Sequence, residues 1–107
     1  MAYGGFGGGN MQQLMKQAQA MQRKLQEAQQ ELADSEVTGS AAGGMVEVTL
    51  TGDKTPVSVS IKSEAVDPDD VEMLEDMVLA ALNDAMKQAD DLSKELLGPM
   101  GNAGGLF

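Results

Sequence analysis

Three cations near the N-terminus are the residues whose type and spacing most clearly point to chemistry. Lys16 and Arg23 are seven residues apart, Lys24 adjoins them, and residues 1–26 contain no acid. Long flexible cations without neighbouring carboxylates are suited to contacts with phosphate groups. Glutamine amides in the same stretch can add hydrogen bonds to a nucleic-acid backbone or to base edges. The amides assigned to this candidate site are those of Gln12 and Gln19.

The alternative interpretation of these cations is an ordinary solvated helix face. On such a face Lys24 would pair with Glu27 or Glu31. Lys87 and Lys94 lie among acids in the sequence, and for them we expect local pairing, as is common between residues three or four apart on a helix.

Other kinds of site find little support in the sequence. The chain has no Cys and no His, which excludes thiol and imidazole chemistry. The acids of residues 67–76 lack the spacing of a calcium loop, and the glycines of residues 4–9 are not followed by the Lys-Ser/Thr of a phosphate-binding loop. We therefore expect no enzymatic activity, no metal and no small-molecule substrate.

The distribution of charge and glycine sets the domain boundaries. The chain has 107 residues and a net charge of −10, yet all 17 acids lie after residue 26. Five glycines fall within residues 1–10 and four within 98–107, so we expect two flexible ends around a single domain over 11–97. No apolar run approaches the roughly 20 residues that cross a bilayer. We expect a cytoplasmic protein.

A long helix is predicted over residues 11–34, with Asn10 as its N-cap. Its apolar residues recur in alternating steps of three and four, the heptad pattern of a helix that packs against one other helix. Lys16 and Arg23 then fall on the face opposite this apolar seam. The seam consists of Met11, Leu14, Ala18, Met21, Leu25, Ala28 and Leu32.

Alternating apolar and polar residues predict two strands, over 46–51 and 57–62, preceded by a shorter strand over 37–40. Short turns at 41–44 and 52–54 favour a three-stranded antiparallel meander with one apolar face. With apolar residues of the last helix, these strands supply the predicted core or dimer contacts. They are Val46, Val48, Leu50, Val57, Val59, Ile61, Val78 and Leu82.

A second long helix is predicted after the strands. Asp67 is its expected N-cap, Pro68 its first residue, and Gly98 its end. The apolar stripe is wide as far as Leu82, so the first half should cover the sheet, and the narrower stripe over 85–96 should project. The predicted fold is α+β, and because two such helices leave apolar faces uncovered, we expect a homodimer.

Several segments resemble one known family. Met15-Lys16-Gln17-Ala18-Gln19 is similar to its first-helix motif, and Val37-Thr38-Gly39 with Gly43-Gly44 is similar to its hairpin. Val66-Asp67-Pro68-Asp69-Asp70 and Asn83-Asp84-Ala85 resemble its acidic helix start and its NDA signature. On these motifs, which span about residues 11–90, the chain resembles the YbaB/EbfC family of bacterial nucleoid-associated proteins.

The resemblance implies a tweezer-like homodimer whose projecting helices bind double-stranded DNA on the nucleoid, with a role in nucleoid organisation or gene expression. It implies no cofactor. In the family, the contacts with DNA are placed on the projecting helices. The resemblance therefore implies that Lys16 and Lys24, in the matching first-helix motif, contact DNA. The alternative from a different class is a protein-interaction adaptor or chaperone-like clamp that uses Met/Leu-lined helical arms.

Overall fold

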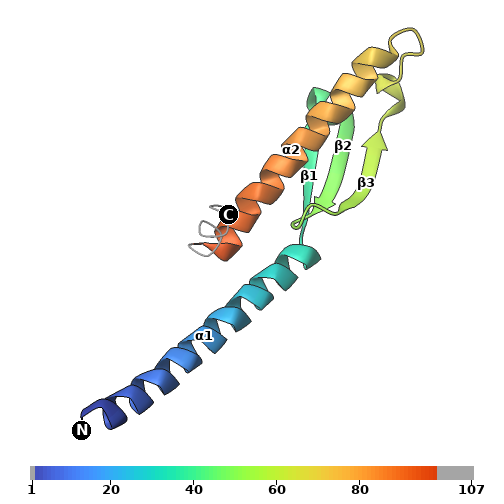
Figure 1. Ribbon diagram of the computed structural model, residues 1–107. Coiled ribbons are helices and arrows are strands. Elements are labelled where there is room, and N and C mark those ends of the chain that lie inside the picture. Colours follow the sequence, from blue (N-terminus) through green and yellow to red (C-terminus); the bar gives the residue numbers. More distant parts are fainter. Residues whose placement is uncertain (1, 99–107) are drawn as a thin grey trace.

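A computed structural model describes residues 2–98 as two long helices and a three-stranded antiparallel sheet (Figure 1). The strand order β1-β2-β3 is that of a meander, so the predicted α+β fold is confirmed. The elements are α1 (Ala2–Asp34), β1 (Glu36–Ala41), a 3₁₀ turn (Ala42–Gly44), β2 (Val46–Thr51), β3 (Pro56–Ile61), a second 3₁₀ turn (Ser63–Ala65) and α2 (Val71–Leu97).

The first helix, α1, projects from the rest of the molecule, and the molecule as a whole is elongated, with extents of 84 × 23 × 16 Å (Figure 1). It begins at Ala2, so the expected start at Met11 is wrong and residues 2–10 are helical in the structure. A helix that has already formed gains one hydrogen bond for each residue added, which lets it continue through glycines. The predicted flexible tail over 98–107 lies outside the described residues from 99 onward.

The sheet packs one apolar face against α2. Val46, Val48 and Leu50 of β2 are 0 %, 4 % and 2 % exposed, as predicted for core residues. They alternate with half-buried polar residues along the strand, because successive side chains of a strand point to opposite faces. Val78 and Leu82 of α2 are half-buried at the border of this core.

The third strand differs from the prediction. Val57, Val59 and Ile61 of β3 remain 48 %, 58 % and 40 % exposed, so within a single chain they are not core residues. Val59 pairs with Val48 and Ile61 with Val46 across the β2–β3 ladder, which places each pair on the same face of the sheet. The reason for their exposure is that α2 lies over β1 and β2 and does not reach across β3.

Small residues bring α2 close to β1. A Cβ added at Gly39 would lie 2.2 Å from the backbone nitrogen of Ala85 and 2.3 Å from the carbonyl oxygen of Ala81. Ala81, Ala85 and Ala89 are fully buried. The expectation that residues 85–96 project is therefore wrong, since this half of α2 packs on β1 and α1.

Hydrogen bonds from α2 also cap the outer edge of β1. The carboxylate of Asp84 accepts a hydrogen bond from the backbone N–H of Ser40 at 3.0 Å. The amide of Gln88 donates to the carbonyl oxygen of Thr38 at 2.8 Å. Asp84 and Ala85, the last two residues of the NDA signature, thus hold α2 against β1, and this edge of the sheet is partly closed to another strand.

The start of α2 is shifted from its predicted place. Asp70, not Asp67, is the N-cap, and its carboxylate accepts from the backbone N–H of Met73 at 3.2 Å. The carboxylate of Asp67 instead accepts from the N–H of Asp69 at 2.9 Å, closing a local turn before the helix. Gly98 ends α2 with a positive φ of 55°, as the sequence predicts.

Candidate functional site

The candidate cation face, defined by Lys16, Arg23 and Lys24, lies on the projecting part of α1. All three side chains are exposed, as are those of Gln12 and Gln19. Lys16 and Arg23 are two turns apart on nearly the same side of the helix, about 10.5 Å along its axis. The structure thus places the predicted residues on one arm that is open to solvent on every side over residues 10–24.

The cation face has no carboxylate partner within the chain as described. In residues 2–98 the one ion pair with nitrogen and oxygen within 4.0 Å joins Lys54 to Asp90. The described residues therefore do not contain the ion pair between Lys24 and Glu27 or Glu31 that the alternative of a solvated face predicts. The local pairing expected for Lys87 and Lys94 of α2 is absent from the described residues as well. Because the α1 cations form no ion pair there, their charges are available for an external anion.

The base of α1 is fixed by contacts with the turn between β2 and β3. The backbone N–H of Gly52 donates to the carbonyl oxygens of Leu32, at 2.9 Å, and Ser35, at 3.0 Å. A Cβ at Gly52 would lie 2.7 Å from that Leu32 oxygen. Two seam residues, Ala28 and Leu32, are buried here at 8 % and 5 % exposure. These contacts set the direction in which the cation face projects.

The turn itself is held by threonine hydroxyls. Thr51 and Thr55 both donate hydrogen bonds to one carboxylate oxygen of Asp53. These bonds, the one from Thr51 first, lower the pKa of Asp53 below its ordinary value of 3.8, because they stabilise the ionised form. Beside this turn, the ammonium of Lys54 lies 2.5 Å from the carboxylate of Asp90 on α2.

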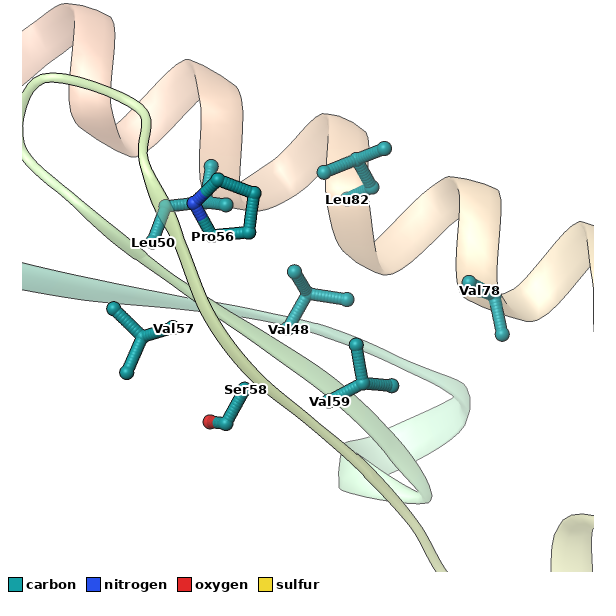
Figure 2. Close-up of a pocket in the computed structure, with 8 residues that line it drawn as sticks. All are labelled: Val48, Leu50, Pro56, Val57, Ser58, Val59, Val78 and Leu82. Carbon is teal, nitrogen blue, oxygen red and sulfur yellow. The ribbon is translucent and has the colours of Figure 1, made fainter.

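An apolar groove, here called the β3–α2 groove, opens where α2 leaves β3 uncovered. It encloses about 330 Å³, and Figure 2 shows side chains of the sheet on one side and those of Val78 and Leu82 on the other. The groove is lined by Val48, Leu50, Pro56, Val57, Ser58, Val59, Val78 and Leu82. Six of the eight predicted core or dimer residues therefore meet here.

The apolar surface continues beside the groove into a depression formed by Ile61 together with α2. It includes Leu74 and Leu79, and the Leu79 side chain is 56 % exposed. Leu79 is missing from the predicted stripe because it lies off the face that covers the sheet. Leu79 precedes Leu82 by three residues and Met86 by seven, and this helical spacing could have predicted that it belongs to an apolar face.

The described residues contain neither a group placed to hold a metal ion nor a membrane-spanning helix. No group of three or more Asp or Glu side chains in residues 2–98 is placed to hold a metal ion. None of the described helices is long and apolar enough to cross a membrane. The features left to explain are the cation face of α1 and the exposed apolar surfaces.

Comparison with known proteins identifies relatives over nearly the whole chain. Residues 7–105 match the model of the YbaB/EbfC DNA-binding family. A nucleoid-associated protein of Agathobacter rectalis is 52 % identical, covering 97 % of this chain and 96 % of that protein. Another from Acetivibrio thermocellus is 48 % identical over the full length of both, and one from Staphylococcus aureus is 60 % identical over 86 % of this chain and 88 % of its own.

The fold has a counterpart among solved structures. The crystal structure of an uncharacterized protein from Helicobacter pylori superposes with a TM-score of 0.71 at 26 % sequence identity. The match covers 83 % of this chain and 94 % of that one. The arrangement of two long helices around a three-stranded sheet is thus shared with an experimentally determined structure.

Proposed function

Because this chain belongs to the YbaB/EbfC DNA-binding family, we propose that it binds double-stranded DNA as a homodimer, with the cation face of α1 in contact with the phosphates. In this proposal the protein acts in the cytoplasm on the nucleoid, in nucleoid organisation and gene expression. It has a binding role and catalyses no reaction.

The single observation that carries the proposal is an exposed, acid-free cation face on an arm that leaves an acidic body. The body repels DNA, because residues 27–107 hold all 17 acids against four cations. Salt screens charges beyond a Debye length of about 8 Å at physiological ionic strength. Lys16 lies eleven residues before Glu27, the first acid of the chain. That separation is about 16.5 Å along a helix, or about two Debye lengths, so the Lys16 end of the arm meets DNA largely free of the repulsion.

The contacts expected from this arm are mainly electrostatic. Lysine and arginine reach phosphates without reading sequence, and the amides of Gln12 and Gln19 can add hydrogen bonds to the backbone or to base edges. A dimer offers six such cations, which gives a slope of log K against log salt of about −5 if all contact phosphate. Binding is then salt-sensitive and largely independent of sequence.

The homodimer part of the proposal is supported by the β3–α2 groove. The groove and the depression beside it, which Glu75 and Asp76 also line, form a mainly apolar surface, and surfaces of this kind on a soluble protein mark contacts with a partner. The outer edge of β1 is capped by Asp84 and Gln88, whereas β3 is the other edge of the sheet. If the two-fold axis of the dimer lies beside β3, a single contact between the protomers would cover the groove in both of them.

The experiment is fluorescence anisotropy of a labelled duplex across a salt series. Wild type is compared with Lys16→Glu/Arg23→Glu/Lys24→Glu, and with Lys87→Glu/Lys94→Glu as the matched control on α2. We expect salt-sensitive binding for wild type and the control, and none for the α1 variant. All three proteins must remain dimeric by sedimentation. Absence of wild-type binding at low salt would overturn the proposal in favour of the adaptor alternative.

A further inference from the structure

The projecting part of α1 carries an apolar stripe on the side opposite Lys16 and Arg23. Met11, Leu14 and Met21 are each 61 % exposed, and Met15 is 59 % exposed. Met11, Leu14, Ala18 and Met21 are the exposed part of the predicted seam and are called the α1 seam, and Met15 lies beside them. We propose that the α1 seam docks against the α1 seam of a second copy, so that arms of two DNA-bound dimers link two duplexes. The link to DNA rests on the function proposed above.

The spacing of the residues in the α1 seam indicates that the partner docked on it is a helix. Its a and d residues recur in steps of three and four, the pattern that packs along one other helix. The stripe is narrow and is interrupted by the small side chain of Ala18. A helix that binds a membrane surface typically has a wider apolar face and large anchoring side chains.

The seam continues a helix contact that already exists in the chain. The same line of residues runs on to Ala28 and Leu32, which are buried where α1 meets α2 and the sheet. The end of α2 at Leu97 lines a cleft with Gln29 and Leu32. The described part of α2 therefore stops short of Met21, and α1 runs on beyond it (Figure 1).

The positions of the charges permit a second copy as the partner. Lys16 and Arg23 point away from the seam, so two seams can meet while these cations stay on the outside. An acidic partner would be drawn to the cation face instead. A seam that docks on its own copy is self-complementary, which is the usual arrangement of a two-fold contact.

The small size of the contact makes it depend on DNA. Two seams of about three turns bury less surface than the roughly 1,200 Å² of a stable interface. Free dimers should therefore not be held together by it. On DNA the cation faces fix the arms with their seams turned outward, and many weak contacts between two coated duplexes add up through avidity.

The test is a bridging assay in which a bead-bound duplex captures a second, fluorescent duplex through the protein. Leu14→Gln/Met21→Gln removes two seam residues, and glutamine preserves helix propensity. The control is Met73→Gln, which changes a methionine of α2 that is 54 % exposed. Anisotropy on a single duplex is measured in parallel.

We expect the seam variant to lose bridging by about tenfold or more, as avidity predicts, while its single-duplex binding stays within about twofold of wild type. The control should bridge normally. Bridging by the seam variant at the wild-type level, or single-duplex binding by wild type without bridging, would overturn the inference alone. Absence of single-duplex binding by wild type would instead overturn the proposed function, and the inference with it.

Discussion

Replacing Val59 by serine should weaken the proposed homodimer without unfolding either protomer. Val59 lies in β3 at the mouth of the β3–α2 groove and is 58 % exposed in the single chain. Because most of its surface is still accessible to water, its contribution to folding within one chain is small. Its neighbour across the ladder, Val48, is already 4 % exposed and supplies the core contact on this face.

The magnitude follows from the uncovered fraction of the side chain. Full burial of a valine contributes about 1.5–3 kcal/mol, and 58 % of that remains available to a partner. A two-fold interface counts the loss twice, so the dimer should lose about 2–3.5 kcal/mol. This corresponds to a rise of roughly 30- to 300-fold in the dimer dissociation constant.

Sedimentation equilibrium across a range of protein concentrations measures this constant directly. Ser60→Ala is the matched control, because Ser60 precedes Ile61 on the opposite face of the same strand. The dissociation constant of the Ser60→Ala dimer should stay near that of wild type. A Val59→Ser dimer within threefold of wild type would refute the assignment of the β3–α2 groove to the dimer contact.

Two further changes test the fold around the site. Gly39→Ala should lower the free energy of unfolding by at least about 3 kcal/mol in urea titrations, because the atoms it would meet are backbone; Gly43→Ala, in open space at φ +67°, should cost only about 1 kcal/mol. Asp53→Asn should be less stable than wild type above pH 3.8, the ordinary pKa, and the difference should vanish as the pH falls through the lowered pKa of folded Asp53. A difference that does not change with pH in thermal melts would contradict the role of the Thr51 and Thr55 hydrogen bonds.

The elements that depend on local pattern could be predicted from the sequence. The alternation of residues 46–51 identifies β2 and its buried face, and short turns dictate the meander. The start of α2 was misplaced by three residues because Asp67 and Asp70 are both suitable caps. Which one caps the helix depends on the turn that Asp67 forms with Asp69, a choice between competing local hydrogen bonds.

Predictions that depend on long-range packing were less successful. Alternation in β3 is as regular as in β2, yet Val59 is exposed and Val48 is buried. The difference arises from Gly39, whose missing side chain lets α2 settle over β1 and so draws it away from β3. The same packing explains why residues 85–96 do not project. A pattern of apolar residues identifies a face, but the element that covers it is set elsewhere in the chain.

The cation face could be predicted from the sequence because three cations without acids occur within one short segment. The spatial separation of this face from the acids could not be predicted. The absence of acids over residues 1–26 is visible in the composition, but a net charge of −10 argues against DNA unless the two charges are kept apart. In the structure the separation comes from the straight α1 and from Gly52, whose hydrogen bonds fix the base of the helix. In the proposed function, an acidic body at the base then favours approach to DNA arm-first, since every other orientation brings carboxylates toward phosphates. The net negative charge that opposes the proposed binding would thus also orient it.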